Sequence, residues 1–244
     1  MKHTWFVWGA LSALVLGGCS SHDPILPGTR TPIFDASTLN MLDTAVPNAP
    51  MDAPARGDGD CPYTQDASNV IWHGDKKIFS GFPTSNSVKS EQKPVCAGGH
   101  LYVGLTTGEV VKINQSTRQV TWVADVYRAS NMTGGAALLD IVSPIIVDGG
   151  AVYVGGLGDA ICRLRADSGA RTWCVPIATA MPMIVAGGVV YVVATDNQVY
   201  AIRASDGAVY WRAPVKKQAA PTLSGGVITV GTHRLNAGTG EKVP

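Results

Sequence analysis

The sequence predicts an all-β protein, a β-propeller of about four four-stranded blades, on three observations. A tyrosine is followed twenty residues later by a tryptophan three times, at Tyr102 and Trp122, Tyr153 and Trp173, and Tyr191 and Trp211. Each pair lies in the same frame: a proline, an apolar run, Gly-Gly, two short strands, a polar turn and the tryptophan. The step from one tyrosine to the equivalent position of the next copy is 38 residues over the last two steps. A period of roughly 40 residues built from short strands is typical of a propeller.

The frame occurs four times, with copies that begin at Pro94, Pro144, Pro182 and Pro221. The inner strands are continuously apolar, as in residues 189–193, which predicts burial on both faces between stacked blades. The Gly-Gly pairs predict tight turns between the first and second strands. Arg118 stands in the first copy where the later copies have glycine before the outer strand. We therefore expect that turn to be strained or of another type.

The two ends of the repeat array leave its closure open. The last copy reaches Gly240, and the chain stops at Pro244, where a tryptophan would fall. Residues 69–73 resemble an outer strand but belong to none of the four copies of the frame. Propellers commonly close by letting an N-terminal strand complete the last blade. The alternatives are a small closed ring, an incomplete ring whose edges need a partner, and a shortened product of a longer propeller.

Residues 1–18 predict a lipoprotein signal peptide. A short positive region precedes an apolar stretch over residues 5–16, which is too short to span a bilayer, since spanning takes about 20 apolar residues. The stretch ends in L-G-G-C, which resembles the bacterial lipobox and implies acyl chains on Cys19 and a membrane anchor. Ser20 after the cysteine favours sorting to the periplasmic face of the outer membrane. The alternative is an ordinary secretory signal with an incidental cysteine.

Residues 19–60 predict a lipidated, disordered tether, since they are rich in proline and show no helical or strand period. Several of its apolar residues are candidates to dock on the domain or on a partner: Ile33, Phe34, Leu39, Met41 and Leu42. Residues 61–244 are long enough for one domain with a core of its own, the predicted repeat domain. The formal net charge is +1 without a basic stripe, which argues against nucleic acid as a partner.

Four cysteines remain for disulfides if Cys19 carries lipid. Cys162 and Cys174 lie six residues on each side of a predicted hairpin turn, and symmetrical positions of a hairpin face each other. This symmetry predicts a Cys162–Cys174 disulfide, and Cys61 and Cys96 would then pair by elimination.

The motifs predict no catalytic residue, metal site or cofactor. The five histidines are scattered outside any zinc or hydrolase motif, and no Cys-x-x-Cys occurs. Asp159, Asp196 and Asn197 lie in turns between strands, where such residues usually serve as turn formers.

Two frames, G-D-A-I-C-R-L with D-S-G and N-Q-V-Y-A-I-R with S-D-G, resemble PQQ-like propeller repeats. Quinoprotein dehydrogenases use such repeats around a quinone with adjacent cysteines and a metal-binding set, and this chain has no adjacent cysteine pair. The chain as a whole resembles the BamB family in its alphaproteobacterial form. Four features carry the resemblance: the lipobox, I-L-P-G-T-R-T-P at residues 25–32, the long spacer before S-P-I-I-V-D-G-G, and V-Y-V-V-A-T-D-N-Q-V-Y-A-I. Members of that family normally have more blades than are countable here.

The resemblance implies a non-enzymatic scaffold of the outer-membrane β-barrel assembly machinery, with no cofactor and no small-molecule substrate. In that family a long loop between blades contacts a periplasmic POTRA domain of BamA. The matching loop spans residues 124–143, and the carried-over partner-binding residues are Arg128, Leu138, Leu139 and Asp140. Three alternatives remain: a solvated loop whose leucines cap a blade, a subunit of another envelope complex such as a secretion system, and a quinoprotein-like sensor or enzyme.

Overall fold

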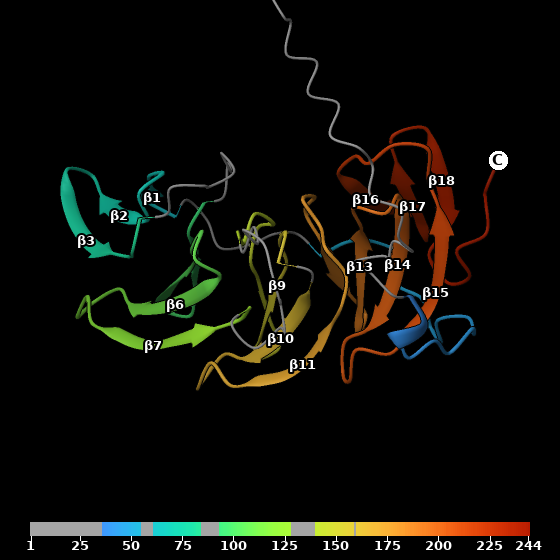
Figure 1. Ribbon diagram of the computed structural model, residues 1–244. Coiled ribbons are helices and arrows are strands. Elements are labelled where there is room, and N and C mark those ends of the chain that lie inside the picture. Colours follow the sequence, from blue (N-terminus) through green and yellow to red (C-terminus); the bar gives the residue numbers. More distant parts are fainter. Residues whose placement is uncertain (1–35, 55–60, 84–92, 128–139, 159) are drawn as a thin grey trace, which may run out of the picture. The chain divides into compact units, whose positions relative to one another are not determined.

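Strands dominate the part of the chain that the computed structural model describes, which is residues 36–54, 61–83, 93–127, 140–158 and 160–244 (Figure 1). The strands form five antiparallel sheets, numbered here in chain order. In the described ranges no helix has the length and apolar character needed to cross a membrane.

The bounds of the elements follow the repeat frame. Sheet 1 holds β1 (Tyr63–Gln65), β2 (Val70–His73) and β3 (Lys76–Ser80). Sheet 2 holds β4 (Val95–Ala97), β5 (His100–Gly104), β6 (Glu109–Asn114) and β7 (Val120–Asp125). Sheet 3 holds β8 (Ile146–Asp148), β9 (Ala151–Val154), β10 (Ile161–Arg165) and β11 (Arg171–Val175). Sheet 4 holds β12 (Ile184–Ala186), β13 (Val189–Val193), β14 (Gln198–Arg203) and β15 (Val209–Pro214). Sheet 5 holds β16 (Pro221–Ser224), β17 (Val227–Val230) and β18 (His233–Asn236), and a single helical turn, η1, covers Ala36–Thr38.

The core lies between neighbouring sheets, in four apolar clusters that join sheets 1 and 2, 2 and 3, 3 and 4, and 4 and 5. Strand β13 shows why its sequence is apolar throughout. Val189, Tyr191 and Val193 belong to the cluster with sheet 5, whereas Val190 and Val192 belong to the cluster with sheet 3. The prediction of stacked propeller blades is therefore confirmed.

Sheet 1 corrects the expected number of about four blades and excludes one of the ways in which the ring could close. Residues 69–73 do not complete the last blade, because β2 lies in a sheet of its own with β1 and β3. Ile71 is fully buried against sheet 2, and the buried Asn69 side chain accepts a hydrogen bond from the Thr106 amide at 3.1 Å. In sheet 5 the chain instead turns back on itself, and Leu235 pairs with Lys242.

The tryptophans cover the next sheet, as the repeat frame predicts, although each is the third residue of its outer strand. Their indole N–H groups donate across the sheet boundary: Trp122 to the Ala166 carbonyl at 3.2 Å, Trp173 to that of Ala204 at 3.0 Å, and Trp211 to that of Ala237 at 3.2 Å. Each ring also covers a turn glycine, and a Cβ added to Gly169 would lie 2.8 Å from the Trp122 ring. Glycine is needed at that turn for space as well as for its φ of 72°.

The predicted turns have the expected backbone. Both glycines of each Gly-Gly pair have positive φ, for example 55° and 74° at Gly98 and Gly99, as a two-residue hairpin turn of this hand requires. Arg118 takes the same left-handed conformation at its turn, with a φ of 61°, so the expected strain is present. The outer strand of sheet 1 reads KKIFS, so it offers no indole that would require glycine at Arg118.

Replacing Arg118 by glycine is expected to raise the free energy of unfolding by up to about 1.5 kcal/mol. A left-handed non-glycine residue costs roughly 1–2 kcal/mol, from which the roughly 0.5–1 kcal/mol entropic cost of glycine is subtracted. Urea unfolding followed by circular dichroism measures the difference. As a matched control, Gly169→Ala should destabilise the chain because its Cβ would meet Trp122. A destabilised Arg118→Gly variant would contradict the assignment of strain.

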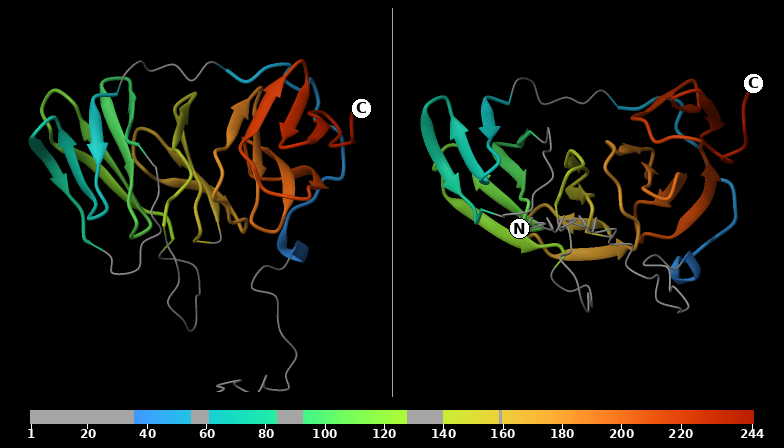
Figure 2. Two further views of the ribbon diagram at one scale, coloured as in Figure 1. Left: turned by 90° about the horizontal axis from the view of Figure 1, so that it is seen from above. Right: turned by 45° about the horizontal axis from the view of Figure 1, so that its top comes forward.

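Residues 39–53, which we call the strap, correct the predicted tether. Met41 forms a parallel bridge with Val209, and the Leu42 amide donates to the Val209 carbonyl at 2.8 Å, so the strap adds to the outer edge of β15 (Figure 2). Leu39 is only 7% exposed and lies in the cluster between sheets 3 and 4. The tether prediction is therefore wrong over the strap, where the backbone obtains partners by edge pairing without any sequence period.

The docking expected of the tether's apolar residues is confirmed where the structure describes them. Leu39 is buried, and Met41 and Leu42 are partly buried against the sheets. Ile33 and Phe34 lie outside the described residues.

Candidate partner-binding site

The predicted partner-binding loop, residues 124–143, starts in β7 of sheet 2 and ends before β8 of sheet 3. The structure describes its first four and last four residues. Arg128, Leu138 and Leu139 lie outside the described residues, so of the four predicted contact residues only Asp140 is placed.

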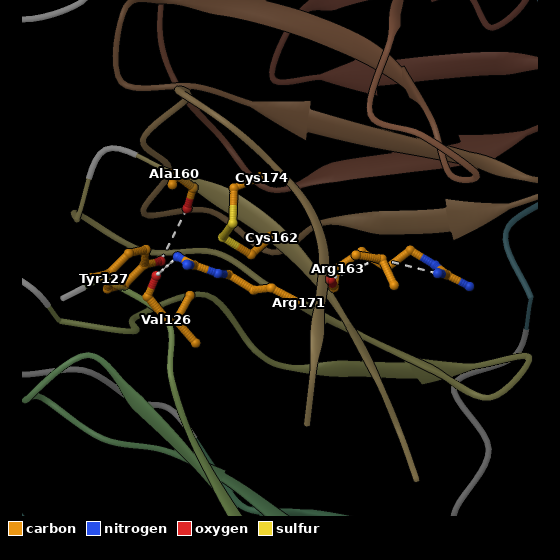
Figure 3. Close-up of a disulfide and its surroundings, with 8 residues drawn as sticks. Val126, Tyr127, Ala160, Cys162, Arg163, Arg171 and Cys174 are labelled. Atoms are coloured by element: carbon orange, nitrogen blue, oxygen red, sulfur yellow. Dashed lines mark hydrogen bonds between the residues drawn. A yellow bond between two sulfur atoms is a disulfide. The ribbon is translucent and has the colours of Figure 1, made fainter. Parts of the chain in front are cut away.

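The first end of the loop is held against sheet 3 by Tyr127 (Figure 3). Its side chain is buried, and its hydroxyl donates to the Ala160 carbonyl at 3.1 Å. The ring lies directly on Gly158, where an added Cβ would come within 2.5 Å of it. The Val126 carbonyl accepts a hydrogen bond of 3.3 Å from the Arg171 guanidinium of β11. This end of the loop is thus part of the blade packing.

The second end is held by Asp140, whose side chain is 1% exposed. Its carbonyl accepts a hydrogen bond from the Leu157 amide at 3.0 Å, and a Cβ on Gly156 would overlap that carbonyl oxygen. Buried Ser143 continues the contact, because its amide donates to the Gly155 carbonyl at 3.2 Å. The expectation that Asp140 orients a partner at the surface does not fit this position, since its carboxyl group is enclosed by the chain itself.

The disulfide of sheet 3 lies beside the first end of the loop (Figure 3). Cys162 and Cys174 are paired positions of β10 and β11, and their sulfur atoms are joined at 2.04 Å. The register is the one that hairpin symmetry predicts. Cys61 and Cys96 are also joined, which connects the segment just before β1 to β4 of sheet 2.

Removing the Cys162–Cys174 bridge with serine at both positions is expected to cost about 2–3 kcal/mol, because the bridge closes a loop of 12 residues. Removing Cys61–Cys96, at a separation of 35, is expected to cost more, since a longer loop loses more entropy when closed. Peptide mapping without reductant checks the pairing first, and denaturant unfolding then ranks the two variants. Free thiols at Cys162 and Cys174 would overturn the register.

A shallow groove of about 430 Å³ lies where sheet 2 meets sheet 3. Lys112 extends into it from β6, with its ammonium 2.7 Å from the Ala166 carbonyl and 5.5 Å from the centre of the Tyr102 ring. Burial lowers the pKa of Lys112, and the charge of Asp167 opposes that shift. The hydrogen bond from Arg165 holds the pKa of Asp167 well below its usual range.

Lys112 lies in no recognised sequence motif, although the sequence contains one signal of its position. It is a lysine within the otherwise apolar stretch V-V-K-I of an inner strand, at the position where the fourth sheet has Ala201. Within the ranges described, no group of three or more histidine, cysteine, aspartate or glutamate side chains is arranged to hold a metal ion.

Comparison with known proteins gives a family and a fold. Residues 55–213 match the family model described as outer membrane protein assembly factor BamB. Comparison with curated protein sequences finds no match. BamB from Moraxella catarrhalis is similar in structure, with a TM-score of 0.61 and 16% identity, over 74% of this chain and 61% of that one. The chain therefore spans about 61% of the length of that protein.

Two dehydrogenases share the fold at lower similarity. Quinohemoprotein alcohol dehydrogenase ADHIIG from Pseudomonas putida HK5 aligns with a TM-score of 0.56 and 14% identity, over 75% of this chain and 40% of that one. A europium-containing methanol dehydrogenase aligns with a TM-score of 0.52 and 11% identity, over 75% of this chain and 48% of that one. At these identities the likeness concerns the fold alone.

Proposed function

The chain belongs to the family of outer membrane protein assembly factor BamB, and from this membership we propose that it is a non-enzymatic scaffold of the outer-membrane β-barrel assembly machinery. The family match over residues 55–213 carries the proposal. The partner we propose is a periplasmic POTRA-type domain of a BamA-like subunit. Sheets packed face to face by the tyrosine–tryptophan frame make a rigid scaffold of the kind on which binding loops are usually presented.

We further propose that the protein is held at the periplasmic face of the outer membrane by lipid on Cys19. The lipobox sequence supports this anchor, and Cys19 itself lies outside the described residues. Two disulfides fit an oxidising compartment such as the periplasm.

A quinoprotein-like sensor or enzyme is the second candidate, favoured by the fold shared with the alcohol dehydrogenase. Pyrroloquinoline quinone with calcium should then raise the melting temperature of the purified chain, because a ligand that binds the folded state stabilises it. An unchanged melting temperature at saturating quinone leaves the scaffold as the better account.

The scaffold function predicts that replacing Leu138 and Leu139 by alanine releases barrel-assembly subunits and leaves the melting temperature nearly unchanged. Apolar anchors in a loop contribute to binding through contact with the partner. Co-purification from detergent-solubilised outer membrane measures the loss. It also separates this proposal from membership of a secretion complex, in which other subunits would co-purify.

Asp140→Ala serves as the control, because its buried carboxyl group predicts a lower melting temperature instead of a specific loss of partner. Wild-type recovery of the assembly subunits with the double leucine variant would reduce the loop to a connector.

A further inference from the structure

The groove between sheets 2 and 3, which we call the open groove, lies between two equivalent Gly-Gly turns. One turn joins β4 to β5 and the other joins β8 to β9. Its walls include Ala97, Gly98 and Tyr102 of sheet 2 and Val147, Gly150 and Ala166 of sheet 3. Because sheets 2 to 5 each contain a Gly-Gly turn, every pair of neighbouring sheets among them has a corresponding position, and the contents of these positions can be compared.

The corresponding position between sheets 4 and 5 is filled by the strap. A Cβ built on Gly187, in the turn of sheet 4, would lie 3.1 Å from Pro50. A Cβ built on Gly226, in the turn of sheet 5, would lie 3.2 Å from Met51. Val46 is 5% exposed and packs in the apolar cluster shared by the two sheets. The strap therefore lies across both turns in van der Waals contact.

Backbone groups hold the strap in this position. The Gly226 amide donates to the Met51 carbonyl at 2.7 Å, and the Ala53 amide donates to the Leu223 carbonyl at 3.1 Å. Such bonds are independent of the side chains of the bound segment, so the site accepts an extended chain as such. Side chains then select which extended chain binds best.

In the open groove, no described residue covers the turn glycines and the backbone groups that are equivalent to those under the strap. Nothing lies within 4 Å of a Cβ built on Gly98 or on Gly150, the counterparts of the two glycines under the strap. Val147 and Gly150 stand where Leu223 and Gly226 bond the strap. Among sheets 2 to 5 the repeat thus presents this pair of turns three times. The strap covers the pair between sheets 4 and 5, whereas the pair between sheets 2 and 3 is open, as is the pair between sheets 3 and 4, where nothing lies within 4 Å of a Cβ built on Gly149 or Gly188. Of the two open positions, the one between sheets 2 and 3 forms the groove of about 430 Å³.

We propose that the open groove binds an extended peptide segment of a partner protein, which lies across its two Gly-Gly turns as the strap lies across those of sheets 4 and 5. The inference deepens the scaffold function and rests on it only for the identity of the partner. The bound segment pairs its backbone with Val147 and Gly150, and it places small apolar residues or proline over the turns.

Charge distinguishes the preferred peptide from the strap. In the strap, the Asp52 carboxylate accepts hydrogen bonds from the Gly225 amide at 3.0 Å and the Ser224 hydroxyl at 3.1 Å. In the open groove Asp148 replaces the serine at the equivalent position of the turn. A carboxylate at that place in the peptide would face a like charge, whereas a lysine would face an opposite one. Lys112 and Asp167 also line the groove, and their opposite charges act on each other, so Asp148 supplies the charge that decides at this place. The groove therefore favours a basic residue where the strap has aspartate.

Photo-crosslinking with two synthetic peptides tests the proposal on the full chain purified in detergent. Both peptides copy residues 44–54 with a benzophenone amino acid in place of Met51, and one of them also carries Asp52→Lys. We expect crosslinks to residues 97–102 and 147–150, identified by mass spectrometry. The lysine peptide should be favoured by about two- to fivefold, the scale of one solvent-exposed ion pair.

Two variants of the chain test the charge preference and the location of the bound peptide. Asp148→Lys, at an exposed side chain, should reverse the preference in favour of the aspartate peptide. Ala97→Trp should lower crosslinking by about tenfold, whereas Lys217→Trp at an exposed position outside the groove should not. Crosslinks confined to residues 186–191 and 223–226 would mean that the peptide only displaces the strap, and either that result or no crosslink overturns the proposal. The peptides need no assembly subunit, so this outcome is independent of the co-purification experiment.

Discussion

Replacing Trp211 by alanine is expected to lower the free energy of unfolding by about 3–5 kcal/mol. The side chain is 6% exposed and belongs to the cluster between sheets 4 and 5. Its indole donates to the Ala237 carbonyl at 3.2 Å, and its ring lies 6.0 Å from that of Tyr191. Tyr191 donates to the same carbonyl at 3.0 Å, so the truncation removes apolar area and one of the two hydrogen bonds that this carbonyl accepts from sheet 4. Guanidinium unfolding followed by far-ultraviolet circular dichroism measures the loss.

Two further variants separate the contribution of the Trp211 hydrogen bond from that of its ring, and compare Trp211 with a tryptophan outside the repeated frame. Trp211→Phe keeps an aromatic ring and loses the indole donor, so we expect a smaller loss of a few kcal/mol at most, with about 1 kcal/mol assigned to the hydrogen bond. Trp72→Ala should cost less than Trp211→Ala, because Trp72 is only partly buried and donates to Asp66 within sheet 1. Equal losses for Trp72→Ala and Trp211→Ala would show that the repeated tyrosine–tryptophan frame is not what holds the sheets together.

The features that repeat could be predicted from the sequence. The Gly-Gly turns, the tryptophan contacts and the opposition of Cys162 and Cys174 each follow from a local pattern that recurs at a fixed period. Arg118 departs from the repeat, and the sequence therefore predicted a strained turn or one of another type; the structure contains the first of these, with a φ of 61°.

The features that depend on contacts across the fold could not be predicted in this way. Sheet 1 lacks the tyrosine–tryptophan frame, so the sequence left Ile71 and its strand without a blade, and the structure places them in a sheet of their own. Asp140 is buried, and its backbone carbonyl contacts Leu157 and Gly156, between β9 and β10 of sheet 3, which no pattern in the loop itself indicates. The strap has no period because its backbone pairs with edges and turns, which places little constraint on its side chains.

The strap should behave as an integral part of sheets 4 and 5. Val46→Asp is therefore expected to lower the free energy of unfolding by about 3 kcal/mol or more. The loss cannot exceed the free energy with which the strap docks on the sheets. An unpaired carboxylate is not tolerated in the cluster around Val46, so the strap should detach first. Hydrogen exchange should then accelerate at the two amides that the strap covers, those of Val209 and Gly226. The Val209 amide donates to the Asn40 carbonyl at 2.8 Å, and the Gly226 amide donates to the Met51 carbonyl. Amides of sheet 2 should keep their protection, because its clusters contain no strap residue.

Ala45→Asp is the matched control for this experiment, because it adds the same charge one residue away at an exposed position. It should leave both the unfolding free energy and the exchange rates close to those of the unaltered chain. If Val46→Asp and Ala45→Asp behave alike, side-chain burial does not anchor the strap, and its backbone bonds alone hold it to the turns. If only Val46→Asp releases the strap, then an inter-sheet groove of this fold binds an extended chain through one buried apolar side chain and a backbone cradle. That second result would also define the contacts that a peptide in the open groove has to make.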